Sequence, residues 1–234
     1  MRTTRRLFPL DGTLIASVLL GVLLFSPLWE RGIPNTADGM LHLYRSTLWL
    51  NAWQEGVFWP RWHTALYLGY GYPLFNFYAP LLYVASSLLG LVLPSSEAAI
   101  KGVLLLTCIG YPLGMYLWAR DLIGRVPAVV AAAAFAFATY RFRELFVQGN
   151  YAQFLAWGMG PWVLFTWRRL TLSSSRGAFL AAVASLTALL FVHNISAMLI
   201  APVAAIYVLW QAVENRATRP WPRLVIGATC AVLM

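Results

Sequence analysis

The sequence is poor in charged residues. Only 11% of its 234 residues are Asp, Glu, Lys or Arg, whereas 60% are hydrophobic; a soluble domain typically carries about 25% charged residues. Acids are the scarcer kind, with 8 against 17 bases, and Lys101 is the sole lysine. This composition predicts an integral membrane protein. Because an arginine excess in such a chain more often sets topology than binds nucleic acid, we expect the lipid bilayer, and no nucleic acid, as a partner.

Several chemical signatures are also missing. The two cysteines, Cys108 and Cys230, lie within apolar runs, which argues against a disulfide framework or a zinc site. The sequence has no Gly-rich phosphate loop, no nucleophile elbow and no nucleotide-binding fingerprint. We therefore do not expect a nucleotide sugar as a direct donor.

Apolar runs occupy most of the chain and predict an all-α, polytopic transmembrane helical bundle. The first run, residues 14–29, follows the segment TRRLF, which resembles a twin-arginine export signal. No small-residue cleavage site follows, so we predict an uncleaved first span. Further runs cover residues 80–93, 100–118, 126–140, 154–167, 179–192, 195–213 and 224 onward. Since the chain stops inside the last run, we expect residues 1–234 to be the N-terminal module of a longer protein.

The arginines predict how these runs are arranged. If every run crossed the membrane, the arginines of residues 120–125 and those at 168 and 169 would fall on opposite sides, against the positive-inside rule. Residues 80–93 are short for a hydrocarbon core that needs roughly 20 helical residues. We predict that they lie along or dip into the outer face, which makes every arginine-rich short connector cytoplasmic, together with Arg2, Arg5 and Arg6. Residues 1–29 then form the first span, 30–98 an outer loop, and 99–234 the further spans.

The outer loop is the longest polar stretch. Asn35, Thr36 and Asp38 are good helix-capping residues, and Gly56 marks a stop. Between them apolar residues recur at helical spacing, predicting an amphipathic helix suited to the membrane interface; they are Met40, Leu41, Tyr44, Leu48 and Ala52. The second half of the loop is rich in aromatics, Gly and Pro, which fits either a packed interfacial cap or a platform for a sugar or lipid headgroup.

Three stretches carry a resemblance to a known family. They are the loop segment ADGMLHLYR with the following GVFWPRW, the segment GYGYPLFNFYAPL, and AAAAFAFATYRFRELFVQGNYAQFLAW. Together they resemble the bacterial multi-spanning membrane proteins related to 6-pyruvoyl-tetrahydropterin synthase, over roughly residues 14–202. That family is similar in layout to C-type glycosyltransferases, which use lipid-linked sugars. The resemblance therefore implies a C-type glycosyltransferase-like fold with interfacial or re-entrant helices in its first outer loop.

The resemblance also implies where the chemistry lies. In C-type glycosyltransferases the acid of the first outer loop acts as base, metal ligand or acceptor-positioning group, and Asp38 occupies that place. A second outer connector, here residues 141–153, faces the same cavity. Its sole acid is Glu144, and Gln153 stands where a glutamate is expected after GNYA, which departs from the family pattern.

Chemistry points to the same residues. Inverting transfer from a polyprenyl-phosphate sugar needs a carboxylate near the acceptor hydroxyl and cations for the leaving phosphate. Asp38 fits the first need, and Arg45, Arg141 and Arg143 are the outer-face cations for the second. Asp38 also fits a helix N-cap, and the arginines fit snorkelling to the headgroups.

The histidines leave further alternatives. His42, four residues after Asp38, could join it around a divalent ion or make a simple polar contact. His193, beside Asn194, fits either an outward cavity or pairing with a neighbouring helix. Cofactors thus stay undefined, with a divalent metal as one option.

Two function classes follow. The first is an outer-face glycosyltransferase that moves a sugar from a polyprenyl-phosphate donor to a cell-envelope glycan, lipid or protein. The second is a non-catalytic transporter or assembly protein that binds lipid or polysaccharide in the same cavity. Absence of an internal repeat in the sequence favours the first.

Overall fold

The computed structural model describes residues 12–215 and 220–233, and most of these residues are helical. The predicted anchoring arginines Arg2, Arg5 and Arg6, and Arg216 and Arg219, lie outside these residues. The helices, in chain order, are α1 (Gly12–Phe25), η1 (Ser26–Trp29), α2 (Gly39–Gln54), η2 (Tyr67–Gly69), α3 (Leu74–Phe77), α4 (Leu81–Gly90), α5 (Ser96–Ile123), α6 (Arg125–Ala136), α7 (Thr139–Phe142), the π-helix η3 (Arg143–Gln148), α8 (Tyr151–Leu172), α9 (Arg176–Val192), α10 (Asn194–Glu214) and α11 (Trp221–Leu233).

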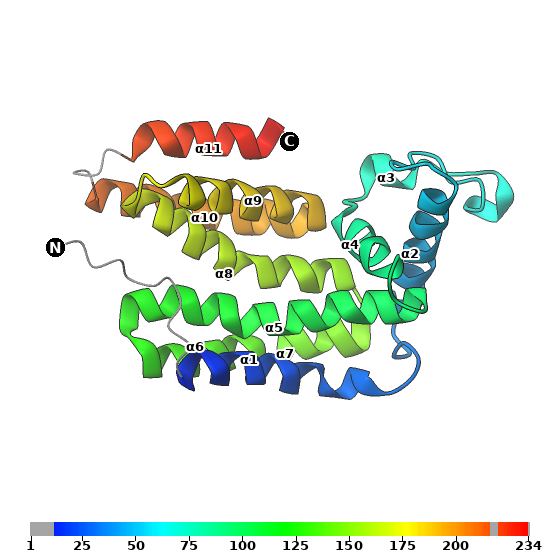
Figure 1. Cartoon of the computed structure of the whole chain (residues 1–234), viewed down its shortest axis with the longest axis horizontal. Coiled ribbons are helices and arrows are strands. Elements are labelled where there is room, and N and C mark those ends of the chain that lie inside the picture. Colours follow the sequence, from blue (N-terminus) through cyan, green and yellow to red (C-terminus); the bar gives the residue numbers. More distant parts are fainter. Residues whose placement is uncertain (1–11, 216–219, 234) are drawn as a thin grey trace.

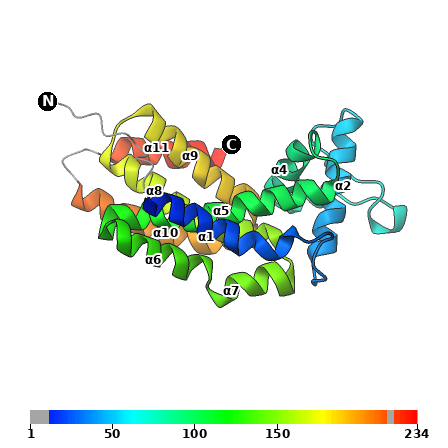
Figure 2. The ribbon, with the colours of Figure 1, turned by 60° about the horizontal axis from the view of Figure 1, so that its bottom comes forward.

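These helices form a bundle with a cap at one end. The long helices run roughly along one direction, and α2, α3 and α4 stand apart beyond one end of them (Figure 1). A second view also shows α2 and α4 beyond this end of the long helices (Figure 2). We call residues 30–95 the cap and its side of the bundle the cap end. The predicted all-helical fold is confirmed for the described residues.

Three helical stretches are long and apolar enough to cross a membrane: Gly12–Trp29, α5 and α10. Helices α4, α6, α9 and α11 are apolar but shorter, so fewer full-length crossings are found than the sequence predicts. Helix α4 has 10 residues, about 15 Å at the rise of an α-helix, against a hydrocarbon core of about 30 Å. Its length and its place in the cap fit the prediction that residues 80–93 do not cross.

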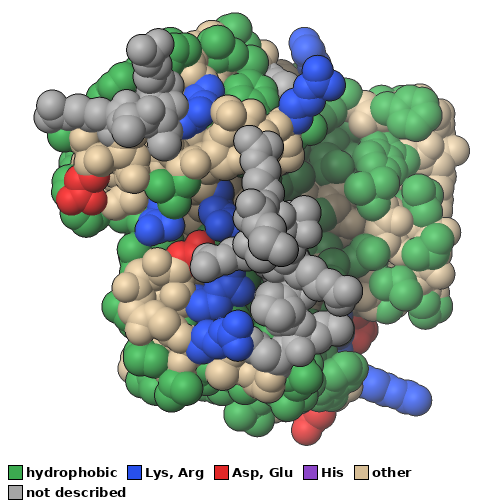
Figure 3. Space-filling view, turned by 60° about the vertical axis from the view of Figure 1, so that its left-hand side comes forward, with side chains coloured by type: hydrophobic (Ala, Val, Ile, Leu, Met, Phe, Trp, Pro, Cys, Tyr) green, Lys and Arg blue, Asp and Glu red, His purple; other side chains and the backbone are tan. Residues whose placement is uncertain are grey.

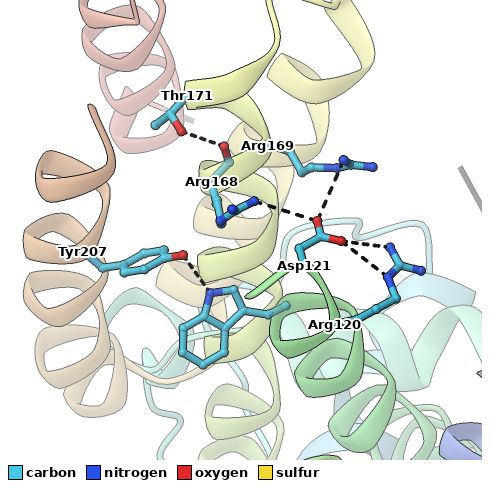
Figure 4. A network of polar contacts seen from close by, with 7 residues as sticks. Arg120, Asp121, Arg168, Arg169, Thr171 and Tyr207 are labelled. Carbon is cyan, nitrogen blue, oxygen red and sulfur yellow. Dashed lines mark hydrogen bonds and ion pairs between the residues drawn. The ribbon is translucent and has the colours of Figure 1, made fainter. Parts of the chain in front are cut away.

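The end opposite the cap collects the arginines, and we call it the arginine end. Arg side chains gather there on the surface (Figure 3), where α5 turns into α6 and α8 into α9. At its centre Asp121 accepts from Arg120 at 3.3 Å and lies 4.0 and 3.8 Å from the guanidinium groups of Arg168 and Arg169 (Figure 4). One carboxylate among three guanidinium groups leaves this end positive, as the arginine pattern predicts.

Helix starts follow ordinary capping chemistry. Ser95 and Ser175 accept backbone N–H bonds at the starts of α5 and α9, and Asn150 does so for α8. His193 caps α10 through Nδ1, which accepts from Ser196 N at 3.2 Å. Because side-chain caps satisfy otherwise unpaired N–H groups, these residues fix where each helix begins at the two ends of the bundle.

Helix α2 lies in the predicted place, directly after Asp38, and its two faces differ in exposure. Met40, Leu41 and Tyr44, from the predicted apolar face, are exposed. His42 and Trp49 are buried against α4 and the loop beyond α2. An interfacial helix presents an outward apolar face to lipid. The inward face of α2 carries buried polar side chains, among them His42 and Ser46.

The aromatic second half of the loop, residues 57–72, projects from the cap. A pair of backbone hydrogen bonds joins His63 and Tyr72, at 3.2 and 3.1 Å. Between them Leu68 is 97% exposed, and both Tyr67 and Leu68 have positive φ angles, 53° and 57°, a conformation that costs about 1–3 kcal/mol in non-glycine residues. The tip is exposed, whereas His63 at its base is buried against Phe75, so both predicted alternatives, an interfacial cap and a platform for a sugar or lipid headgroup, stay open.

Candidate functional site

The site is built around the start of α2. Thr36 Oγ1 accepts the Gly39 N–H bond at 3.1 Å, and the Asp38 side chain makes no capping bond. Backbone bonds from Ala37 N to Val147 O, at 3.2 Å, and from Asp38 N to Gln148 O, at 2.8 Å, join this turn to η3. Since Thr36 takes the capping role, the half-buried Asp38 carboxylate is available for other contacts, one of which is Gln148 Nε2 at 3.4 Å.

Glu144 lies in η3, next to this junction. Its side chain is buried; Oε1 accepts from Arg143 at 3.4 Å, and Oε2 has no hydrogen-bond partner among the described residues. Burial raises the pKa of Glu144, with the Asp38 carboxylate acting in the same direction and the Arg143 guanidinium against it. A buried carboxyl group with a raised pKa beside a second carboxylate is a frequent arrangement in acid–base sites.

The next turn of α2 carries a histidine in a tyrosine pocket. His42 Nδ1 lies 2.9 Å from the Tyr83 hydroxyl, and its ring lies against those of Tyr83 and Tyr151. Burial lowers the pKa of His42 to about 3, with the charges of Arg45 and His193 acting in the same direction. His42 is therefore a neutral polar group at pH 7, and its Nδ1 makes the polar contact with the Tyr83 hydroxyl.

Arg45 closes this pocket from the same helix. Its Nη1 donates to the Tyr83 hydroxyl at 3.4 Å, and its guanidinium lies 4.7 Å from the centre of the Tyr78 ring. Burial raises the pKa of both tyrosines, so they stay neutral donors and acceptors. The Arg45 guanidinium thus lies beside two neutral phenol groups.

His193 reaches the pocket from the turn between α9 and α10. It is close enough to His42 to lower that residue's pKa, and burial lowers its own. The neighbouring Asn194 donates to Phe77 O in the cap at 3.1 Å. The Nδ1 atom of His193 caps α10. The main role of His193 is therefore to fix the start of α10 beside the pocket, and not to offer this atom to a ligand.

Gln153 serves the local structure. Its Nε2 donates to the Tyr140 hydroxyl at 2.6 Å, and its Oε1 accepts from Asn150 at 3.2 Å. The first bond ties the first turn of α8 to α7, and the second joins that turn to its own N-cap residue. The amide donates to one partner and accepts from the other, so Gln153 has a structural role at the start of α8.

The two arginines that precede Glu144 differ. Arg143 is exposed and paired with Glu144, as a snorkelling arginine would be. Arg141 is only 8% exposed, and its guanidinium is surrounded by the rings of Phe135, Trp157, Tyr111 and Tyr140, at 4.7, 5.1, 5.5 and 5.8 Å. A guanidinium buried among rings is inconsistent with snorkelling.

Six of the eight predicted site residues therefore meet in two neighbouring groups at the cap end, and Arg141 and Gln153 lie outside both groups. Asp38, Glu144 and Arg143 form the first with Gln148, and His42, Arg45 and His193 form the second. Sequence reasoning missed the side chains that hold these groups together: Tyr78, Tyr83, Gln148, Asn150 and Tyr151. Polar aromatic residues inside otherwise apolar runs are the signal that could have pointed to the tyrosines.

A metal site gains no support from this geometry. Among the described residues no three His, Cys, Asp or Glu side chains lie close enough together to hold an ion. His42 turns its Nδ1 toward Tyr83, so the predicted pairing with Asp38 around a divalent ion does not acquire a third ligand.

Comparison with known families decides the relationship. Residues 75–232, more than half of the chain, match the model of the family described as 6-pyruvoyl-tetrahydropterin synthase related domain, a membrane protein. The chain belongs to this family. The match covers α4 to α11 together with η3, the element that carries Glu144, and the family description names no reaction. No curated protein and no solved structure matches the chain.

The pocket around His42 makes stability depend on pH. Its folded pKa, about 3, lies below the unfolded value of about 6.5, so between these values the unfolded state binds more protons. We expect stability to fall as the pH falls below about 6.5, by up to about 1.4 kcal/mol per pH unit from this group. Thermal unfolding in detergent between about pH 5 and 7 measures it. The variant His42→Gln should have a shallower slope, and an unchanged slope would contradict the assignment.

Proposed function

We propose that this protein is a membrane glycosyltransferase that moves a sugar from a polyprenyl-phosphate donor to a cell-envelope glycan, lipid or protein. The observation that carries the proposal is the Asp38 carboxylate, which is free of a capping role and held by backbone bonds beside Glu144 and Arg143. A carboxylate for the acceptor hydroxyl and a cation for the leaving phosphate are the groups that this transfer requires.

In this proposal Asp38 accepts the proton of the acceptor hydroxyl as the acceptor oxygen bonds to the sugar C1. The bond between C1 and the phosphate oxygen breaks, and the lipid phosphate leaves with the electron pair. Arg143 and Arg141 offset the charge of that phosphate. Glu144, with its raised pKa, holds a proton more readily than an ordinary glutamate and can donate a hydrogen bond to a sugar hydroxyl.

The proposal includes an orientation in the cytoplasmic membrane. Arginine-rich connectors favour the cytoplasmic side, and those of the described chain lie at the end opposite the cap. With the arginine end inside, the cap and Asp38 lie on the outer face, where lipid-linked sugars meet cell-envelope acceptors.

Transfer can be tested directly. The protein, purified into proteoliposomes, is incubated with polyprenyl-phosphate hexoses labelled in the sugar and with an envelope extract as acceptor, and free polyprenyl phosphate and labelled product are measured. Proteoliposomes with the Asp38→Asn variant are the control. Release of lipid phosphate together with labelled product supports the proposal. Donor that binds but is never consumed, across the panel of sugars, would favour the non-catalytic transporter or assembly protein.

A further inference from the structure

Arg141 lines an apolar groove. A cavity of about 530 Å³ opens between α5, α6, α8 and α10, and Arg141 is the sole charged residue in its lining. Its other walls include Phe135, Trp157, Leu164, Leu199 and Val203. This volume falls within the range of small-molecule sites, and the lining combines one cation with a long apolar surface.

The cation itself lacks a matching anion. Arg141 makes no ion pair within 4 Å among the described residues, and its buried Nε has no hydrogen-bond partner there. Aromatic rings attract a guanidinium by their faces but offer no acceptor in the plane where its N–H groups point. A buried charge is costly unless it is paired, so this arrangement favours a ligand that brings an anion.

The groove lies near the two carboxyl groups of the candidate site, Asp38 and Glu144. Arg141 and Asp38 both lie close enough to Glu144 to shift its pKa. An anion at Arg141 would thus sit near the two carboxyl groups, while an apolar chain attached to it could extend along α8 and α10 toward Trp118, also in the lining.

We infer that this groove binds the isoprenoid chain of a polyprenyl phosphate, with the phosphate on the Arg141 guanidinium. The identity of the lipid rests on the proposed function, since a sugar donor of that class must place its phosphate beside Asp38. The contacts that would recognise the lipid are those of a buried guanidinium with phosphate and of apolar side chains with a hydrocarbon chain.

Binding of undecaprenyl phosphate to the purified full chain, measured by native mass spectrometry in detergent, tests the inference. Arg141→Gln should weaken binding about 10- to 100-fold, the effect of losing a charged hydrogen-bond partner, whereas Arg31→Gln, at an exposed position outside the groove lining, should change it little. Val203→Trp fills the groove and should weaken binding at least about 10-fold. Ile206→Trp adds the same side chain at an exposed position of the same helix, outside the groove lining, and should bind as wild type.

The outcomes are distinct. Wild-type affinity in Val203→Trp would overturn the inference even if Arg141→Gln failed to fold. Equal competition by phosphatidic acid would also overturn it, because the groove would then accept any anionic lipid. Binding that depends on Arg141 and Val203 without sugar transfer keeps the inference and removes the proposed function. Transfer by Val203→Trp at the wild-type rate and affinity keeps the proposed function and removes the groove.

Discussion

The variant Asp38→Asn is expected to transfer sugar about 10²- to 10⁴-fold more slowly than the wild type, the usual contribution of a positioned general base. Asparagine has the same shape, and its carbonyl oxygen can still accept the Gln148 amide that now donates to Asp38. The backbone bonds to η3 do not involve the side chain, and the cap of α2 belongs to Thr36. The loss should therefore appear in the rate and not in stability.

A matched control lies at the other end of the same helix. Glu55→Gln makes the same change of charge at the exposed C-cap of α2 and should keep the wild-type rate. Both variants should unfold within about 0.5 kcal/mol of the wild type, as surface substitutions usually do. If Asp38→Asn transfers sugar as fast as Glu55→Gln, Asp38 is not the base. The position of Asp38 near Glu144 then has another purpose.

Local signals in the sequence predicted the helices well. Helix α2 begins directly after Asp38 and ends before Gly56, and α10 covers residues 194–214 against the predicted 195–213. Both limits depend on residues within one turn of the helix end, through capping groups and glycine. The gathering of arginines at one end was also predictable, because it follows from charge and span order alone.

The choice of capping residue was not predictable from composition. Thr36 and Asp38 both suit an N-cap, and the chain uses the threonine hydroxyl. What decides between them is the pair of backbone bonds to residues 147 and 148, more than 100 positions away. A contact at that separation leaves no periodic trace in the sequence, and neither does the ring of aromatic residues around Arg141, drawn from α5, α6 and α8 as well as from its own segment.

The outward apolar face of α2 shows a second limit. Spacing reveals that Met40, Leu41 and Tyr44 share a face, but not whether that face meets protein or lipid. Tyr83 and Tyr151 determine which face of α2 turns inward, because both contact the polar side chain of His42. Helix existence is therefore a local property, whereas its rotation depends on side chains from other elements.

Replacing Gly149 with alanine is expected to destabilise the protein by about 3 kcal/mol or more and to abolish transfer with it. Gly149 has a φ of +68°, where a side chain costs about 1–3 kcal/mol, and a Cβ there would overlap Thr36 Oγ1 and lie 2.7 Å from Gly39 N. The start of α2 would have to move away from η3. The backbone bonds of Ala37 and Asp38 would be lost, each worth about 0.5–1.5 kcal/mol.

The variant Gly56→Ala separates the cost of the positive φ from the cost of the clash with Thr36. Gly56 has a comparable φ of +84°, but a Cβ added there meets nothing within 4 Å, so this variant carries the backbone strain alone and should keep its transfer rate. Thermal unfolding and transfer are measured for both variants. If they unfold at the same temperature, the close approach of Gly149 to Thr36 is unimportant. If Gly149→Ala is the less stable variant and also loses transfer, the junction between α2 and η3 holds Asp38 beside Glu144. The position of the base then depends on the absence of a side chain at residue 149.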